Sequence, residues 1–284
     1  MTEKTLTPAR KLFFGLFVFP LLIAVGMAVL LCSVVLLTNE KETPETLIGA
    51  IKSGTPSKRW QKAFELSNEL TQNRYKNIRD AGVLKEIIYI LKDSEHYDTK
   101  TRGYMAMALS HFPESDSVEA LRGALKEDSQ EIQIAAMWSL GSLSVRETSP
   151  AIELFLNSDQ PELRKMSVYV LGVLGEKRIA PRLQPLLLDP VHDVRWNAAL
   201  ALARLGDDSG YQVLTEMAER GKFDALSMEE PQIEAVMINA IKGLALIHKP
   251  ESIKIFETIS REDKNMKVRQ AAIDAMNYQK QLSA

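Results

Sequence analysis

One short pattern recurs along most of this chain, and it limits the fold more than any other feature of the sequence. Its clearest copy is residues 189–206, DPVHDVRWNAALALARLG. Counted from Arg195, small or apolar residues stand three, four, six and seven places on, which is the spacing of one face of an α-helix. The same register fits the stretches 59–66, 102–109, 133–140, 164–171, 234–241 and 269–276. The starts at 102, 133, 164 and 195 lie 31 residues apart. A fixed period of this length predicts an all-α solenoid built from helix pairs.

Each copy of the pattern predicts a first helix, which a second helix then follows. The expected pairs are 57–70 with 83–92, 99–112 with 117–127, 130–143 with 149–157, 161–174 with 178–188, 191–205 with 209–220, 231–247 with 250–260, and a final helix at 264–281. Residues 57–284 are therefore assigned to the solenoid. Residues 38–56 are assigned to a linker and a capping helix, because Pro44 suits the first turn of a helix and a terminal repeat needs a cover. Glycines that fall at or near the ends of first helices permit a left-handed C-cap there: Gly141, Gly172, Gly175 and Gly206.

The pattern at 189–206 resembles that of the HEAT-repeat family, in the short, Ala-rich variety first named from phycobilisome lyases. It consists of an acidic residue, a short gap, Val-Arg and then Ala-Ala-x-Ala-Leu. The match is also good at 159–175, DQPELRKMSVYVLGVLG, and looser elsewhere. The resemblance implies a right-handed α-α superhelix of about seven helix pairs whose concave side usually holds another protein. It implies an adaptor rather than an enzyme. It also implies a ladder of buried ion pairs, for which the candidates are Asp189 with Arg195 and Asp263 with Arg269.

The N-terminal part of the chain contains a run, residues 12–37, without a single charged side chain. A helix of this length measures roughly 39 Å, more than the roughly 30 Å apolar thickness of a bilayer. We therefore expect one transmembrane helix at 12–37 that contacts lipid, preceded by a tail at 1–11. A cleaved signal peptide and a lipoprotein signal are the alternatives. The run is longer than a usual signal core, and Leu31 precedes Cys32 where a lipoprotein signal needs a small residue.

The charges on either side of this run favour a cytoplasmic N-terminus. Lys4, Arg10 and Lys11 precede the run, whereas Lys41 is the only basic residue in the short polar stretch after it. We therefore expect a single-pass protein of the inner (cell) membrane whose solenoid lies on the periplasmic or extracytoplasmic side.

Composition argues against several classes of function. A formal net charge of −2 supplies no basic excess for binding nucleic acid. Cys32 is the only cysteine, so an intramolecular disulfide and a thiolate metal site are excluded. The four histidines lie in different repeats, without the i, i+4 spacing of a helical metal site. With no nucleophile elbow and no glycine-rich phosphate loop, we expect no catalytic residue, no metal and no cofactor.

Large apolar residues recur at one place of the pattern, five residues after its start: Phe64, Met107, Trp138, Tyr169 and Leu200. Trp60 and Trp196 stand four residues earlier in their helices and thus on the same side. These side chains either cover gaps between neighbouring first helices or face a partner. On the second interpretation, Met107, Trp138, Tyr169 and Trp196 are candidate partner contacts.

Two further groups of residues are candidates for partner binding. Second helices are expected to line the concave side, where Arg122, Lys126 and Arg182 are among the polar residues that face it. Phe223 lies in an irregular, unusually apolar segment at 220–232. That segment is either a functional excursion or packs on the preceding helix.

The sequence therefore predicts a membrane-anchored scaffold or adaptor that binds other proteins as an accessory part of a membrane complex. Two alternatives remain open. One is an enzyme similar to the phycobilin lyases, which share the repeat with this chain. The other is a receptor for a peptide or lipid in the concave groove.

Overall fold

The computed structural model describes residues 14–38, 43–72, 81–127 and 129–283, and every regular element in these ranges is helical. The chain divides into two compact units, Met1–Thr46 and Leu47–Ala284, and each is described by itself. The predicted tail at 1–11 lies outside the described residues, as do the first two residues of the predicted membrane helix.

The first unit contains a long apolar helix. A π-helical turn, η1 (Phe14–Val18), leads into α2 (Phe19–Thr38), and the window Leu16–Ser33 is long and apolar enough to cross a membrane, with a mean hydropathy of 2.6. The hydroxyl of Ser33 donates to the carbonyl of Val29 at 2.7 Å, so this polar group is satisfied inside the helix. A signal sequence meets the same criterion of length and composition.

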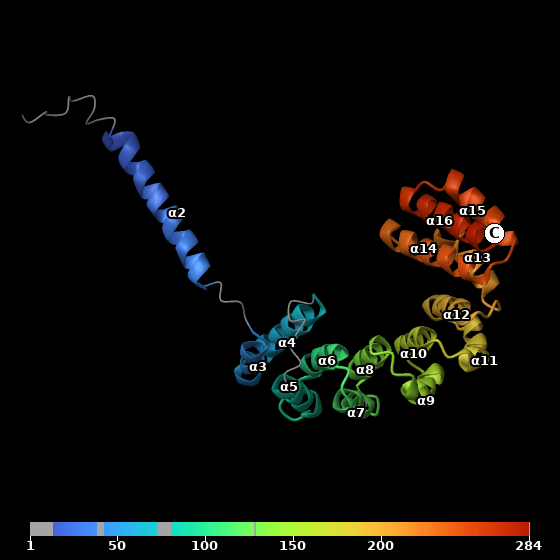
Figure 1. Cartoon of the computed structure of the whole chain (residues 1–284), viewed down its shortest axis with the longest axis horizontal. Helices are drawn as coiled ribbons and strands as arrows, with labels where there is room; N and C mark the ends of the chain where they lie inside the picture. The colour runs from blue at the N-terminus through green and yellow to red at the C-terminus, as the bar shows by residue number, and fades with distance from the viewer. Residues whose placement is uncertain (1–13, 39–42, 73–80, 128, 284) are drawn as a thin grey trace, which may run out of the picture. The chain divides into compact units, whose positions relative to one another are not determined.

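The second unit is a row of helix pairs (Figure 1). Its helices are α3 (Pro44–Ser53), α4 (Pro56–Thr71), α5 (Ala81–Lys92), α6 (Thr99–Ala108), α7 (Ser115–Ala124), α8 (Gln130–Ser142), α9 (Ser149–Glu153), α10 (Pro161–Leu174), α11 (Ala180–Leu183), α12 (His192–Leu205), α13 (Tyr211–Met217), α14 (Glu230–Ile247), α15 (Glu251–Glu262) and α16 (Met266–Ser283). Short 3-10 turns join them: η2 (Leu109–His111), η3 (Arg146–Thr148), η4 (Leu154–Asn157), η5 (Lys177–Ile179), η6 (Gln184–Leu188) and η7 (Arg220–Phe223). The predicted all-α solenoid is confirmed.

The first helices lie close to their predicted bounds, and α10 coincides with the predicted 161–174. Four of the second helices, α7, α9, α11 and α13, are shorter than predicted, and α9 and α11 pass directly into 3-10 turns. The predicted helix at 178–188 is divided among η5, α11 and η6. Pro185 lies inside η6 and has no N–H group with which to continue the α-helical hydrogen bonds.

The first helices, not the second, line the concave side of the solenoid. Each of α4, α6, α8, α10, α12, α14 and α16 packs on the next of this series, whereas among the described helices between them only α5 and α7 pack closely on each other. When the helices on one side of a row pack closely and those on the other side do not, the row curves so that the closely packed helices lie on the inside. Figure 1 shows α4 to α12 on the inside of the curve and α5, α7, α9 and α11 on the outside. The prediction that second helices line the concave side is therefore wrong. We call the first helices the inner row and the second helices the outer row.

Small residues allow this close approach within the inner row. A Cβ atom added to Gly172 on α10 would lie 2.7 Å from the Cβ of Ala201 on α12, and one added to Gly141 would lie 3.0 Å from the side chain of Val170. Both distances are shorter than ordinary contacts, so glycine is needed here for space.

The glycines at helix ends divide into two groups. Gly175 and Gly206 adopt left-handed φ values of 73° and 78° and cap α10 and α12, as predicted. Gly141 and Gly172 lie inside helices and contact the next helix of the row. Their prediction as C-caps is wrong, because their role is to let neighbouring backbones approach.

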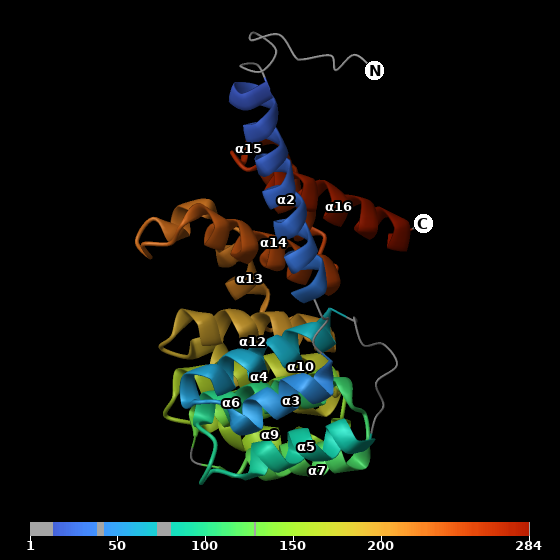
Figure 2. The same ribbon diagram turned by 90° about the vertical axis from the view of Figure 1, so that its left-hand side faces the viewer.

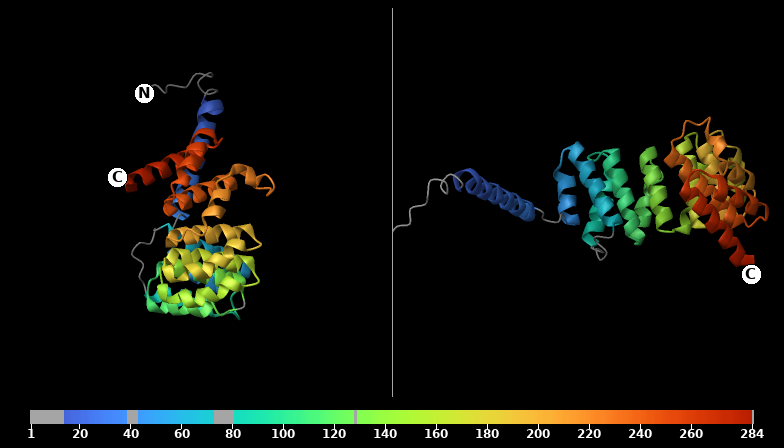
Figure 3. Two further views of the ribbon diagram at one scale, coloured as in Figure 1. Left: turned by 90° about the vertical axis from the view of Figure 1, so that its right-hand side faces the viewer. Right: turned by 90° about the horizontal axis from the view of Figure 1, so that it is seen from above.

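The buried apolar side chains form two clusters that meet at α12. One cluster extends from α3 to α12 and the other from α12 to α16. On α12, Leu202 belongs to the first cluster, whereas Ala199 and Ala203 belong to the second. Figure 2 shows α4, α6, α10 and α12 running in one direction, and Figure 3 shows α16 at an angle to the helices before it. The last helix of the second cluster is therefore not parallel to the inner helices of the first cluster.

Candidate partner-binding site

The inner row carries large apolar side chains on the face that points away from the core. Phe64 on α4 is 50% exposed and Tyr169 on α10 is 38% exposed. The equivalent residues Met107, Trp138 and Leu200, on α6, α8 and α12, are half-buried. Helical geometry explains their position: the places three, four, six and seven residues after the pattern start face the core, so the fifth place falls on the opposite side.

All three tryptophans of the chain lie on this face. Trp60 and Trp196 are half-buried and stand one turn before the fifth place on α4 and α12. The ammonium of Lys100 lies 3.4 Å from the centre of the Trp60 ring, which joins α6 to α4. We use the name concave strip for the following residues: Trp60, Phe64, Met107, Trp138, Tyr169, Trp196 and Leu200.

The concave strip combines both roles that its pattern suggested. Met107 packs against the first apolar cluster, and Trp196 and Leu200 pack against the second. Phe64 packs edge-on against Tyr104 of the next inner helix, with ring centres 5.4 Å apart. These residues therefore cover joints between helices and still expose apolar surface. That they contact a partner remains a prediction.

Acidic residues stand on the same face, in the first turns of three consecutive inner helices. They are Glu131, Glu162 and Asp193, on α8, α10 and α12. A carboxylate in the first turn is stabilised by the helix dipole. Glu162 accepts a hydrogen bond from Gln130 at 3.3 Å, and Asp193 lies 3.5 Å from the ammonium of Lys165. Because the Lys165 and Asp193 side chains are exposed, this contact contributes little.

Arg122, Lys126 and Arg182 belong to the outer row, so they do not face the concave side. Arg122 and Lys126 line a groove of about 860 Å³ between α7 and η3, together with Glu147. The guanidinium of Arg182 lies 3.8 Å from the carboxylate of Glu153. The predicted concave position of these three residues is wrong, because it assumed that second helices form the inner side of the curve.

Phe223 is only 2% exposed, so its ring is not available to a partner. It packs edge-on against Trp196, with ring centres 6.0 Å apart. Of the two interpretations of the irregular segment, packing is therefore the one that applies to Phe223, which contacts the strip residue Trp196. Leu226 of the same segment stays 36% exposed.

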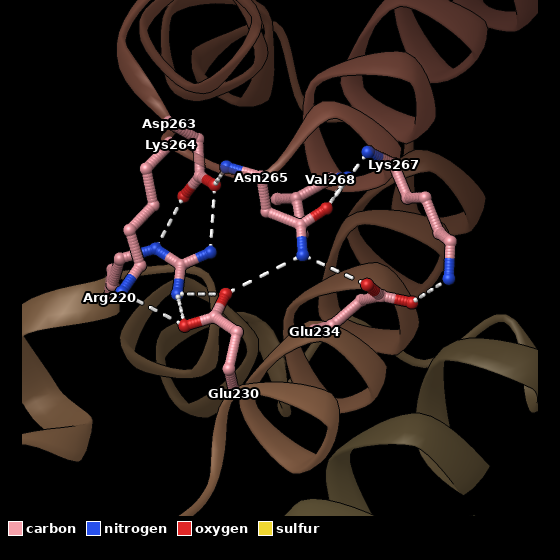
Figure 4. A network of polar contacts seen from close by, with 8 residues as sticks. All are labelled: Arg220, Glu230, Glu234, Asp263, Lys264, Asn265, Lys267 and Val268. Atoms are coloured by element: carbon pink, nitrogen blue, oxygen red, sulfur yellow. Dashed lines mark hydrogen bonds and ion pairs between the residues drawn. The ribbon is translucent and has the colours of Figure 1, made fainter.

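A polar clasp holds the irregular segment to the last helices (Figure 4). Arg220 on η7 donates two hydrogen bonds to Asp263, of 2.9 and 2.7 Å, and two to Glu230, of 2.9 and 3.0 Å. Beside it, Asn265 donates to Glu234 at 2.8 Å. We call Arg220, Glu230 and Asp263 the clasp. Sequence reasoning missed it, because Arg220 and Asp263 are 43 residues apart.

The clasp replaces an ion pair that its repeat cannot make. In an earlier repeat the residue at the pattern start, Arg164, binds the carboxylate of Asp189 through hydrogen bonds of 2.7 and 2.9 Å. The equivalent start in α14 is Glu234, an acidic residue that cannot form an ion pair with Asp263. Arg220 supplies the missing positive charge. An acidic residue at a place otherwise filled by Arg or Gln was the one available signal in the sequence.

The ion-pair ladder therefore differs from the pairs that the family resemblance implied. Arg195 donates to the backbone carbonyl of Asp189 at 2.6 Å, while the Asp189 carboxylate binds Arg164, 25 residues away. Arg102 and Glu127 repeat this 25-residue pairing. The predicted ion pairs between residues six places apart, Asp189 with Arg195 and Asp263 with Arg269, are therefore wrong. The arginine at the pattern start instead binds the acidic residue at the end of its own helix pair.

Both aspartates of the ladder are held ionised. The guanidinium of Arg164 lowers the pKa of Asp189 below its ordinary value of 3.8, against the opposing effect of burial, and the N–H of Val191 adds to this. For Asp263, burial is the largest influence and raises the pKa. Hydrogen bonds from Arg220 and from the N–H of Asn265, together with nearby positive charge, outweigh it, so this pKa also lies below 3.8.

The described residues contain no group of three or more His, Cys, Asp or Glu side chains placed to hold a metal ion. The carboxylates of the clasp are engaged by Arg220, and Cys32 is exposed on α2. The chemistry that this arrangement offers is therefore apolar and ionic contact along the inner row.

Comparison with protein families finds HEAT repeats at residues 84–153 and 148–230. A search of curated proteins finds no match. Among solved structures, the complex of CpcE and CpcF of phycocyanin lyase from Nostoc sp. PCC7120 is similar, with a TM-score of 0.58 and 20% identity over 86% of this chain and 96% of that chain. YibA of Escherichia coli is similar with a TM-score of 0.52 and 14% identity, over 84% of this chain and 93% of that chain. At these identities the likeness is one of fold.

Proposed function

This chain belongs to the HEAT-repeat family, and we propose that it is a membrane-anchored scaffold that holds a partner protein in the curve of its solenoid. The observation that supports this proposal is the concave strip. Phe64 on α4 and Tyr169 on α10 are exposed, and the strip residues Met107, Trp138 and Leu200 on the other helices are half-buried. A soluble surface ordinarily carries polar residues at such places. Large apolar side chains that recur on one face of a protein are a feature of interaction surfaces.

The apolar helix α2 supports the membrane part of the proposal. It has the length of a bilayer span, and its only polar side chains inside the spanning window, Cys32 and Ser33, are small. Lys4, Arg10 and Lys11 before the span favour a cytoplasmic N-terminus. The solenoid then acts on the extracytoplasmic side, as an accessory part of a membrane complex. The likeness to the phycocyanin lyase complex supports the fold and assigns no reaction to this chain.

The anchor makes a prediction about cell fractions. The full-length chain is expected to stay in the membrane pellet after extraction with alkaline carbonate, because α2 spans the bilayer rather than resting on its surface. N-terminal sequencing of the extracted protein is expected to show the original N-terminus. A mature protein that begins after Ser33 and is found in the soluble fraction would show instead that this helix is a cleaved signal.

The strip makes a prediction about partner capture. Replacing Phe64 and Tyr169 together by serine is expected to abolish cross-linking to the partner in native membranes, while stability falls by only about 1 kcal/mol, because both residues are already partly exposed. The measurement is cross-linking followed by mass spectrometry. Tyr89→Ser on α5 of the outer row, where the ring is 52% exposed, is the matched control and is expected to leave cross-linking intact. If the double variant melts many degrees lower, the strip is a packing device and the proposal fails.

A further inference from the structure

The concave strip repeats at a regular distance, because each inner helix from α4 to α12 contributes one large side chain at the same place. Packed helix axes lie about 8–10 Å apart. Side chains that point toward the inside of a curve converge, so the spacing between successive strip residues falls toward the lower end of that range. An occupant that lies along the strip gains the most contact if its own side chains repeat at the same interval.

Three backbone conformations offer different intervals. A polyproline II helix has three residues per turn and a rise of about 3.1 Å, so every third side chain returns to one face after about 9 Å. An α-helix returns to the same face after seven residues, about 10.5 Å. A β-strand returns after two residues, about 7 Å. The polyproline II interval matches that of the inner row best.

The tryptophans of the strip supply a second, independent observation. Among the described residues, the indole N–H groups of Trp60, Trp138 and Trp196 make no hydrogen bond, and none of them is sealed from solvent. An indole nitrogen only donates, so each of these groups is open to an acceptor on an occupant of the strip. An α-helix has already used its carbonyl groups internally, whereas a polyproline II segment keeps all of its carbonyls free. Aromatic-lined grooves bind proline-rich segments by this combination of ring contact and donation.

The acidic residues add charge complementarity. Glu131, Glu162 and Asp193 recur once per inner helix on three consecutive helices, at the interval of the strip. Of these, Asp193 has two basic neighbours, the ammonium of Lys165 at 3.5 Å and Nε2 of His192 at 3.2 Å, and both contacts are exposed and weak. A segment with lysine or arginine at every third position places one positive charge opposite each of these carboxylates.

We propose that the concave strip binds a proline-rich, basic segment of the partner in the polyproline II conformation, three residues for each inner helix. The proposal rests on the proposed function, namely that the strip holds a partner. The flat rings accept the proline faces, the indole N–H groups donate to the carbonyls of the segment, and the acidic row pairs with its basic side chains. The strip ends at Leu200, because the equivalent places on α14 and α16 are Asn239 and Asp274.

The experiment uses the full-length chain in nanodiscs of neutral lipid and synthetic peptides as probes. The test peptide repeats Pro-Pro-Arg, and the two comparison peptides are a Pro-Pro-Glu repeat and an alanine-rich helical peptide with the same number of arginines. Because all three tryptophans lie on the strip, intrinsic fluorescence reports binding there without a label. The Pro-Pro-Arg peptide is expected to shift the emission saturably and to bind about tenfold more tightly than either comparison peptide.

Two variants separate the contacts. Trp138→Phe keeps an apolar ring and removes one N–H donor, and it is expected to lower the affinity for the Pro-Pro-Arg peptide about fivefold. Glu162→Lys reverses one acidic charge and is expected to weaken the same peptide about tenfold while strengthening the Pro-Pro-Glu peptide. Tyr89→Ser on the outer row is the control and is expected to change neither affinity.

The outcomes distinguish this inference from the proposed function. Equal affinity for the two proline-rich peptides, or tighter binding of the helical peptide, would overturn the proposed chemistry of the occupant. If no peptide binds while partner cross-linking in membranes still depends on Phe64 and Tyr169, the polyproline inference is wrong and the scaffold function stands. If cross-linking also ignores these residues, both are wrong.

Discussion

Replacing Arg220 by methionine is expected to lower the free energy of unfolding of the C-terminal helices by about 3 kcal/mol. Methionine keeps the apolar stem and removes the guanidinium, so the loss reports the charge. The carboxylate of Asp263 has a side-chain exposure of 5%, and without Arg220 it keeps only the N–H of Asn265 as a short-range hydrogen-bond donor. Hydrogen exchange is the appropriate measurement, because it should rise in α14, α15 and α16 and stay unchanged from α4 to α10, whose side chains belong to the other apolar cluster.

The pH dependence of this variant follows from the pKa of Asp263. Its folded-state pKa lies below the ordinary 3.8, so the clasp contributes its stability in full above that value and loses it as the pH falls through the folded pKa. The difference in the free energy of unfolding between the native chain and Arg220→Met should therefore be constant near neutral pH and shrink below pH 3.8. A difference that persists unchanged in acid would contradict an ionic origin.

Two further variants test the clasp. Arg178→Met is the matched control, since Arg178 also makes ion pairs, with Glu153 and Glu176, but its side chain is 55% exposed, and little change is expected. Glu234→Arg in the Arg220→Met background restores a cation at the pattern start of α14. It is expected to recover part of the lost stability, because position 234 already lies within contact of Asn265, two residues from Asp263.

Replacing Gly172 by alanine is expected to destabilise the solenoid by about 2 kcal/mol, even though alanine favours a helix more than glycine does. The new Cβ would lie 2.7 Å from the Cβ and 2.9 Å from the Cα of Ala201, so α10 and α12 would have to move apart. Gly103→Ala on α6 is the control, because a Cβ there meets no atom within 4 Å. That change is expected to stabilise the protein by about 0.5–1 kcal/mol. Thermal unfolding of both variants should show shifts of opposite sign, and a stabilising Gly172→Ala would mean that the inner row is not limited by backbone contact.

The repeat made most of the fold predictable, because its period and its small helix face describe a single local rule. That rule placed α10 correctly and put Gly175 and Gly206 at helix ends. The same small helix face also indicates the direction of curvature, because helices that approach one another closely form the inner side of a bend. The prediction placed the second helices there by analogy, and Arg122 and Arg182 were consequently assigned to the wrong face.

The candidate site was predictable only in part. Trp138 and Tyr169 were identifiable because their spacing follows the repeat, and spacing is visible in a sequence. The clasp was not identifiable, because Arg220 does not stand at a position of the repeat pattern and binds Asp263, which is distant in the sequence. The role of Phe223 stayed open for a related reason: an apolar residue in a long connection can be a partner contact or a packing residue until its neighbour, here Trp196, is known.

The meeting of the two apolar clusters at α12 has a mechanical consequence. The contribution of this helix to the second cluster includes Ala199 and Ala203, whose side chains are the smallest that carry a Cβ. The same helix also contributes Trp196 and Leu200 to that cluster and Leu202 to the other, so a movement of α12 would shift contacts in both clusters at once. Arg220 binds Glu230 and Asp263, which both lie beyond α12, so the clasp strengthens the second cluster and not the joint between the two.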